Sequence, residues 1–270
     1  PITCYLSAYA GRTIRICIEA QTDGSLPTTW YIDDVRVSRC STSTVLKGIV
    51  ILAEPADESH DSKHDRAYYE ELFASVRSYH IENTMGRVVL NLDGVYDNGG
   101  SWYTLSKVHL DYAADPLSFV REAEQAALGT TAIPADTIAI VVHAGPASQK
   151  RLTNRNHYIA TQTWEKPQSP NGNEIIVSEN DEVGGWAHEI GHDLGTILVN
   201  SVTPDLYRMG TVDKWDLMAD GSWNGGLFCG LSPLFCTGTN PPHMSSYTKE
   251  FLQLLSYQRV GPYVGGSYWV

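Results

Sequence analysis

The stretch AHEIGHDLG, residues 187–195, contains two histidines four positions apart and a glutamate directly after the first. In an α-helix this spacing puts both imidazoles on one face. Zinc binds neutral imidazole nitrogens, and a catalytic zinc site takes three protein ligands and leaves one position for water. His188 and His192 are therefore predicted to be two zinc ligands, and the third ligand must come from elsewhere in the chain.

Glu189 lies beside this predicted site without being needed as a ligand. In the HExxH pattern such a glutamate acts as general base: it takes a proton from a zinc-polarised water, which attacks a carbonyl while the metal stabilises the oxyanion. An accidental match on an ordinary amphipathic helix is the alternative. The surroundings argue against it, because residues 181–183 supply acidic side chains for a helix start and Gly195 is expected to stop the helix. The chemistry predicted is peptide hydrolysis.

The composition is that of a globular protein. The 270 residues are 42% hydrophobic, which is enough for a sizeable core. We expect no membrane span, because the apolar runs at 49–53 and 138–142 are far shorter than the roughly 20 residues required. A net charge of −12 without concentrated Lys and Arg argues against nucleic acid as a partner. The first methionine is Met85, so we expect a processed or recombinant piece of a longer product.

Residues 1–44 differ in pattern from the rest. Residues 13–19 alternate apolar and polar side chains, residues 31–37 nearly do so, and turn-forming residues lie between them. Two or three strands cannot bury a face alone. The segment resembles the closing strands of jelly-roll modules in secreted bacterial proteins, which commonly end in a YIDDV strand. We expect a short all-β tail at 1–44 and a separate domain at 45–270 that carries the predicted zinc site.

From residue 45 onward, strands alternate with helices. The predicted elements are strands at 48–53, 88–92 and 138–143, helices at 65–81 and 116–128, and a short edge strand at 174–177. Together they predict an α/β domain of α+β type, with a mixed sheet and helices over the metal-binding helix.

Residues 196–270 are rich in Gly, Trp, Ser and Pro until a predicted helix at 246–257. They indicate a smaller, irregular lower lobe beneath an upper lobe at about 45–195. A cleft between two such lobes, floored by the zinc helix, suits an extended peptide lying against an edge strand.

Three segments carry a specific resemblance: HEIGHDLG at 188–195, PDLY at 204–207 and WDLMADGSW at 215–223. They resemble the immune inhibitor A family of secreted metzincin metallopeptidases, and the likeness spans about residues 45–260. It implies a metzincin-like fold and a secreted zinc endopeptidase with protein or peptide substrates. It also implies a methionine turn beneath the metal, supplied here by Met218.

The chain departs from this family at the third ligand. In the family an aspartate ligand comes three residues after the metal-helix glycine, whereas here residues 196–203 intervene and Leu198 has that spacing. The resemblance implies Asp205 as the ligand, because its PDLY surroundings match and the extra residues loop out at modest entropic cost. The alternative is Glu250, as in HExxH enzymes that use a downstream helical glutamate. Tyr207 is the candidate hydrogen-bond donor to the oxyanion, since some related enzymes use a tyrosine.

The five cysteines bear on localisation. Cys229 and Cys236 lie in a Gly/Pro-rich loop, where a disulfide would stabilise by about 2–3 kcal/mol and imply an oxidising, extracellular environment. Two unlinked thiols are the alternative. The other three are Cys4, Cys17 and Cys40, so an odd cysteine remains, and upstream sequence is a candidate source of its partner.

Two classes of function stay open. One is a secreted zinc endopeptidase with Glu189 as general base. The other is a catalytically impaired metzincin-fold module that binds matrix or cell-surface partners, and the insertion after Gly195 favours it. Asp181 and Glu182 are candidates for a structural calcium site, although a helix-start role explains them equally well.

The remaining histidines show no ligand spacing. His143 ends a predicted buried strand, so we expect a hydrogen-bonded core histidine. The other five lie in polar loops or near strand ends, where solvated side chains are usual: His60, His64, His109, His157 and His243.

Overall fold

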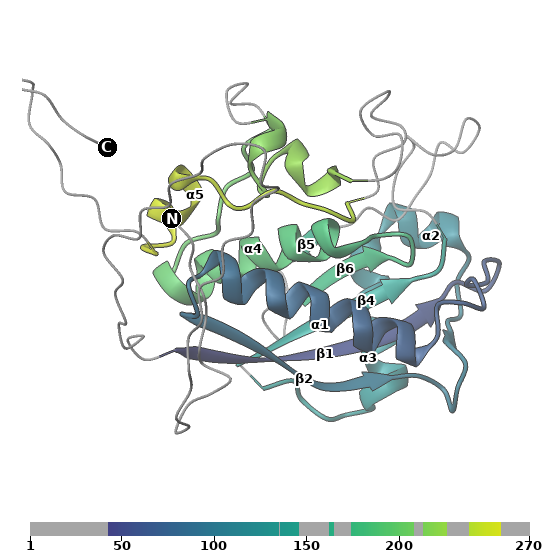
Figure 1. The fold of residues 1–270 in the computed structure, drawn as a ribbon. Coiled ribbons are helices and arrows are strands. Elements are labelled where there is room, and N and C mark those ends of the chain that lie inside the picture. Colours follow the sequence, from purple (N-terminus) through teal and green to yellow (C-terminus); the bar gives the residue numbers. More distant parts are fainter. Residues whose placement is uncertain are drawn as a thin grey trace, which may run out of the picture.

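The computed structural model describes residues 43–134, 136–145, 162–164, 174–207, 213–225 and 238–254. Almost all of the predicted β-rich tail and both cysteines of the predicted disulfide, Cys229 and Cys236, lie outside these ranges. The described chain forms a sheet with helices on both faces (Figure 1).

The sheet has six strands in the order β2-β1-β4-β6-β5, with β3 pairing to the end of β1. The strands are β1 (Thr44–Glu54), β2 (Val88–Tyr96), β3 (Tyr103–Thr104), β4 (Thr137–His143), β5 (Gln162–Trp164) and β6 (Glu174–Ser178). Paired strands run parallel except β5, which is antiparallel to β6. The predicted mixed sheet is therefore confirmed.

The prediction that residues 174–177 form an edge strand is wrong. β6 lies between β4 and β5, and all five of its residues are buried. Ile175 and Val177 join the core on one face of the sheet, and Ile176 joins the core on the other. An apolar run without alternation is typical of a strand covered on both faces, and this one was too short to be distinguished from an edge strand by pattern alone.

Helices cover the two faces of the sheet. They are α1 (Arg66–Asn83), α2 (His109–Ala114), α3 (Pro116–Leu128), α4 (Val183–Val199) and α5 (Ser246–Phe251), with 3-10 helices η3 (Asp213–Trp215) and η4 (Asp220–Trp223). One core contains buried residues of α1 and α4, and the other contains buried residues of α2 and α3. The helices predicted at 65–81 and 116–128 correspond to α1 and α3.

The central strands supply both cores through their two-residue period. Val50 of β1 and Ile140 of β4 belong to the α1/α4 core, whereas Ile51 and Val141 belong to the α2/α3 core. Successive side chains of a strand point to opposite faces, so burial of both faces requires the continuous apolar runs seen in the sequence.

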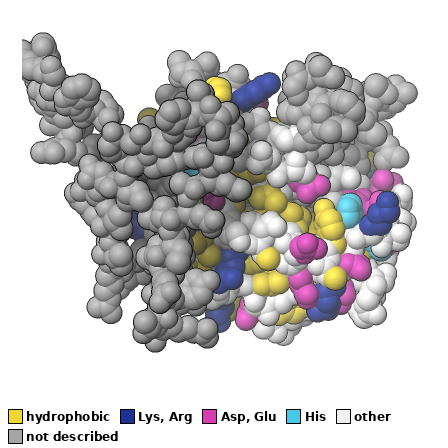
Figure 2. All heavy atoms as spheres, viewed as in Figure 1, with side chains coloured by type: hydrophobic (Ala, Val, Ile, Leu, Met, Phe, Trp, Pro, Cys, Tyr) yellow, Lys and Arg dark blue, Asp and Glu magenta, His cyan; other side chains and the backbone are white. Residues whose placement is uncertain are grey.

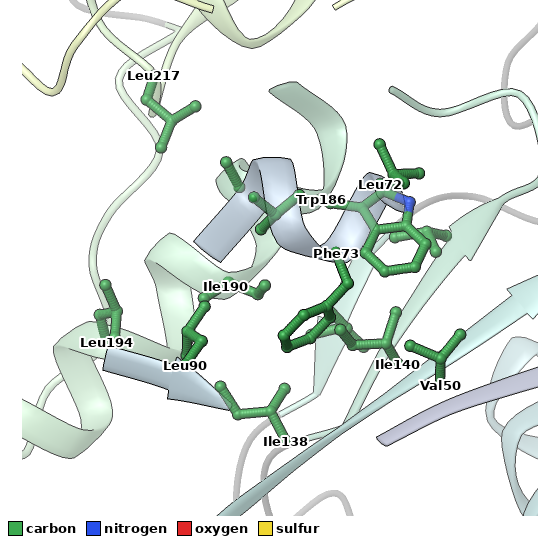
Figure 3. Close-up of a cluster of buried hydrophobic side chains, with 14 of the residues drawn as sticks. Val50, Leu72, Phe73, Leu90, Ile138, Ile140, Trp186, Ile190, Leu194 and Leu217 are labelled. Atoms are coloured by element: carbon green, nitrogen blue, oxygen red, sulfur yellow. The ribbon is translucent and has the colours of Figure 1, made fainter. Parts of the chain in front are cut away.

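An apolar stripe on α4 determines which way its histidines face. Trp186, Ile190 and Leu194 recur every four residues and pack with α1 and the sheet, as Figure 3 shows with Phe73. A helix turns by about 100° per residue, so a position two residues further along is rotated by about 200°. Positions 188 and 192, which lie midway between the stripe residues, therefore point to the opposite side. His188 therefore faces away from the sheet, toward the segments that follow α4.

Within the described ranges, each helix is too short or too polar to traverse a lipid bilayer. On the described part of the face in Figure 2, acidic, basic and hydrophobic side chains are interspersed. Charges of both signs close together give no single-sign field on that part of the surface.

His80 makes the stability of the fold sensitive to acid. Its side chain in α1 is fully buried, and burial lowers its pKa to about 3, although the nearby Ala187 backbone opposes the shift. An unfolded histidine has a pKa of about 6.5. Between these values the unfolded chain binds a proton that the folded protein does not, so the free energy of unfolding decreases as the pH falls.

We expect His80 to account for a loss of about 2 kcal/mol in the free energy of unfolding between pH 7 and pH 5. Denaturant titrations at both pH values should show a smaller loss in His80→Leu than in the unmodified protein. The exposed His243, which pairs with Glu82, provides the control variant His243→Leu. An unchanged pH dependence in His80→Leu would contradict this assignment.

Candidate metal centre

The two histidines of α4 are held by backbone carbonyls. The Nδ1 atom of His188 lies 2.8 Å from the Leu217 carbonyl oxygen, and that of His192 lies 2.6 Å from the Thr203 carbonyl oxygen. A carbonyl oxygen accepts hydrogen bonds and cannot donate them, so each Nδ1 carries a proton. Both Nε2 atoms are then directed away from these partners, which is the arrangement that metal-binding histidines require.

Asp205 completes a compact group with these histidines. Its Oδ1 atom lies 3.2 Å from His188 Nε2 and 3.5 Å from His192 Nε2, and the two Nε2 atoms are 3.2 Å apart. Among the described residues, this is the one group of three or more His, Cys, Asp or Glu side chains close enough to share a metal ion. Glu250 is exposed on α5 and does not belong to it.

The separations of these ligand atoms fit zinc. A tetrahedral ion with bonds of about 2.0–2.2 Å holds its ligand atoms roughly 3.3–3.6 Å apart. The separations of 3.2–3.5 Å agree with this within a few tenths of an ångström. The Asp205 side chain is 54% exposed, so the group opens to solvent on its side. Three ligands and an open side are what a catalytic zinc site needs.

The charges around His192 and Asp205 favour the presence of a cation at this group. Burial lowers the pKa of His192, but the Asp205 hydrogen bond, the Glu189 charge and the Thr203 carbonyl outweigh burial and raise it to about 8. Burial opposes charge on Asp205 too and so raises the pKa of its carboxyl. Hydrogen bonds to His188 and His192 outweigh burial and hold that pKa well below its usual value. Without metal, a proton on His192 therefore balances the Asp205 carboxylate.

The prediction that the metal helix stops at Gly195 is wrong. α4 continues for four more residues to Val199, and Asn200 caps it in the left-handed conformation, with φ 55° and ψ 35°. Gly195 instead permits a close backbone crossing, because a Cβ there would lie 2.3 Å from the Thr203 backbone nitrogen. The chain returns across the helix at this point and brings Thr203 to His192. Half of the insertion thus extends the helix, and the rest returns the chain to the site.

Met218 lies against α4 between the histidines. It is fully buried, and a Cβ added to Gly191 would lie 2.6 Å from its sulfur. Its carbonyl oxygen accepts a hydrogen bond from the backbone N–H of Leu206, the residue after Asp205, at 2.7 Å. Met218 therefore lies next to the helix that carries both histidines, and its backbone is bonded to the chain beside the Asp205 carboxylate.

Tyr207 and Glu189 flank the group. The Tyr207 ring is 5.6 Å from the His188 ring and remains 43% exposed. Partial burial raises its pKa to about 12; the Asp205 and Glu189 charges add to the shift, and a hydrogen bond with Ser222 opposes it. The phenol therefore stays protonated at neutral pH and can donate a hydrogen bond. Glu189 is 7% exposed and close enough to influence both Tyr207 and His192 electrostatically.

The other histidines lie apart from this group. His143 is fully buried, with Nδ1 2.8 Å from the Ala144 carbonyl oxygen, which confirms the expected core histidine. The expectation of solvated side chains is wrong for His60 and His64, which pair with the carboxylates of Glu54 and Glu179 at 2.8 and 3.0 Å. These carboxylates lie at strand ends, where the local sequence gave no indication that the loop would fold back. The expectation is also wrong for His109, which is buried, and His157 lies outside the described residues.

The structure offers no support for calcium at Asp181 and Glu182. The Asp181 carboxylate accepts a hydrogen bond from the Ser178 backbone N–H at 2.8 Å, and Glu182 is the N-cap position of α4. Both residues therefore help to shape the start of the metal helix, and neither joins a ligand group in the part of the chain that is described.

Sequence reasoning missed the two carbonyls that hold the histidines, those of Leu217 and Thr203. Every residue has a backbone carbonyl, so side-chain identity carries no signal for such a partner. Asp216 was missed as well, although it lies within the WDLMADGSW segment at 215–223. The detectable signal was an acidic residue among apolar neighbours, and the structure buries it completely.

This fold and this group of side chains define a mixed α/β protein with a candidate metal centre built on a helix. The family model for the immune inhibitor A peptidase M6 catalytic domain matches residues 111–260, more than half of the chain, and the protein belongs to this family. The family is one of metallopeptidases, which are hydrolases. The match begins later than the likeness inferred from the sequence, which extended from about residue 45.

No curated protein matches the chain. Among solved structures, wild-type OgpA from Akkermansia muciniphila is similar, with 12% sequence identity and a TM-score of 0.35. The alignment covers 80% of this chain and 62% of that one, so the chain spans less than two thirds of that protein's length.

Proposed function

We propose that this protein is a zinc endopeptidase of metzincin type, in which His188, His192 and Asp205 hold the metal and Glu189 is the general base. The observation that carries the proposal is the convergence of three ligand atoms, all within 4.8 Å of one another, from residues separated by the insertion. Family membership supports the reaction class. Met218 is assigned to the methionine turn because of its contact with Gly191.

The side chains around the centre have distinct roles in this proposal. When bound, zinc polarises a water molecule and stabilises negative charge on the substrate carbonyl oxygen. Glu189 accepts a proton from the attacking water and passes it to the departing amine. Tyr207, protonated at neutral pH, donates a hydrogen bond to the carbonyl oxygen as charge develops there. The Leu217 and Thr203 carbonyls keep the imidazoles oriented throughout.

Removal of the metal tests the proposal directly. Dialysis against a strong chelator should abolish hydrolysis of a generic unfolded protein substrate, and addition of one equivalent of zinc should restore it. Hydrolysis that survives complete metal removal would exclude the mechanism. Zinc binding without hydrolysis would instead favour the alternative, an impaired metzincin-fold module that binds matrix or cell-surface partners.

The alternative rested on the insertion after Gly195. In the structure the chain that follows this glycine returns to the site, and the Asp205 carboxylate lies beside both histidines. The insertion therefore does not disrupt the ligand group, and we favour the enzyme.

Zinc binding should release a proton. His192 has a pKa of about 8 without metal, so it is mostly protonated at pH 7, and zinc must displace that proton. We expect release of about one proton at pH 7, and an affinity that rises by up to about tenfold per pH unit toward pH 8. Calorimetric titrations in two buffers with different ionisation enthalpies measure the release. A heat of binding that does not depend on the buffer would contradict it.

We further propose that the protein is secreted, with a β-rich tail at 1–44 and a catalytic domain at 45–270 whose upper and lower lobes meet at about residue 195. The support for secretion is the spacing of Cys229 and Cys236, together with the resemblance of three sequence segments to a family of secreted peptidases. Mass spectrometry of an unreduced digest tests the disulfide, and two separately alkylated thiols would count against secretion.

A further inference from the structure

Asp216 is a buried carboxylate with three hydrogen-bond donors. It is 0% exposed. Its Oδ1 accepts from the Met218 backbone N–H at 2.7 Å, and its Oδ2 accepts from the Ser245 backbone N–H at 2.9 Å and the Thr248 hydroxyl at 2.7 Å. Hydrogen bonds to a carboxylate are about twice as strong as neutral ones. The side chain therefore joins the segment after η3 firmly to the first turn of α5.

The segment that Asp216 holds contacts the metal centre at two points. The Leu217 carbonyl oxygen accepts from His188 Nδ1 at 2.8 Å. The Met218 carbonyl oxygen accepts from the backbone N–H of Leu206, next to Asp205, at 2.7 Å. A shift of this short segment would therefore displace a histidine ligand and the carboxylate ligand together.

The other end of this connection is fixed to α1. The Tyr79 hydroxyl donates to the Pro242 carbonyl oxygen at 2.6 Å, and the Asn83 side-chain oxygen accepts from the Met244 backbone N–H at 2.8 Å. Both α1 residues belong to the helix that packs on α4 and the sheet. Asp216 thus connects the candidate metal centre to α1 through residues 242–245 and the first turn of α5.

We propose that Asp216 is a positioning residue of the metal centre, which holds the Leu217 and Met218 carbonyls where His188 and the chain at Asp205 need them. The proposal rests on the proposed zinc site and assigns Asp216 no contact with substrate. Partners that orient a metal ligand typically change metal affinity by about 10–100-fold when they are altered.

The substitution Asp216→Asn tests this role because it keeps the shape and replaces one acceptor atom with a donor. Its zinc dissociation constant, measured by competition with a chromophoric chelator, should rise about tenfold. A second readout uses the metal-free protein: the imidazole Nδ1–H proton of His188, observed by NMR and assigned with His188→Gln, should shift or broaden. General loss of stability would produce neither change in protein that remains folded.

Glu179→Gln is the matched control. The Glu179 carboxylate is also buried, at 5% exposure, and it also accepts three hydrogen bonds. They come from the Asp61 and Gly145 backbone N–H groups and the His64 ring. None of these donors contacts the ligand group in the described structure. The variant should lose stability comparably while its zinc affinity and the His188 signal remain unchanged.

Variants at Thr248 keep the test decisive if Asp216→Asn does not fold. Thr248→Val removes one donor to Asp216 and should weaken zinc binding in the same direction but less, whereas Thr248→Ser keeps the hydroxyl and should restore it. Zinc affinity and a His188 signal unchanged in Asp216→Asn, or in Thr248→Val if the former is unfolded, would overturn the proposal. If the unmodified protein binds no zinc, the proposed function fails, and the metal-free His188 signal still decides the role of Asp216.

Discussion

Replacement of Glu189 by glutamine is expected to reduce peptide hydrolysis by roughly two to four orders of magnitude while zinc remains stoichiometric. Glutamine has nearly the same shape but cannot accept a proton from water. Glu189 is no member of the three-ligand group, so its loss should leave the metal in place. The measurement pairs turnover of a fluorogenic peptide with metal analysis of the same sample, so that loss of chemistry is separated from loss of zinc.

Glu71→Gln supplies the control for charge. Glu71 is exposed on α1 and lies outside the ligand group, so its substitution should change turnover little. If Glu189→Gln retains most of its activity, the general base is another group and the mechanism proposed here is wrong. If Glu189→Gln loses zinc as well as activity, Glu189 is itself a metal ligand, and the proposed set of three ligands is wrong.

Asp205→Ala should have the other large effect, a loss of zinc and activity together. The carboxylate lies 3.2 and 3.5 Å from the Nε2 atoms of His188 and His192, and its removal leaves two ligands for a metal that needs three from the protein. We expect zinc affinity to fall by at least about 100-fold, beyond the usual effect of an indirect partner. Competition with a chelator and a peptidase assay on the same preparation measure both quantities.

Glu250→Ala distinguishes the two candidate third ligands. Glu250 is exposed on α5 and lies outside the ligand group, so zinc affinity and turnover should stay close to those of the unmodified protein. The opposite pair of results, with metal lost in Glu250→Ala and kept in Asp205→Ala, would move the protein to the class with a glutamate ligand. It would also remove the basis for assigning Met218 to a methionine turn.

The helices α1 and α3 were predicted well, because residue spacing within each segment is enough to identify them. α3 begins at Pro116 and ends at Leu128, as its proline and apolar spacing indicated, and α1 lies within two residues of its predicted ends. Periodicity reports which face of an element is buried, and that depends on residues a few positions apart. It reports nothing about which strand becomes a neighbour, so the interior position of β6 was missed.

Gly195 shows why local rules fail near the site. A glycine after an apolar helical stretch usually marks a C-terminus, because glycine accepts the left-handed conformation there. Here it serves a different need: the chain from Thr203 crosses α4 so closely that a Cβ would collide with its backbone nitrogen, and Asn200 takes the cap instead. Sequence alone does not distinguish a glycine needed for its backbone angles from one needed for its small size.

The sequence by itself determined the part of the site that lies within one helix. The spacing of His188, Glu189 and His192 places them together on any helix, and an apolar stripe on the other side turns them away from the sheet. The tertiary structure alone decided which distant carboxylate lies beside them, since the path of a loop depends on all the contacts it crosses. It also decided the histidine tautomers and the burial of Asp216, because these depend on backbone carbonyls and amides brought close only when the chain folds.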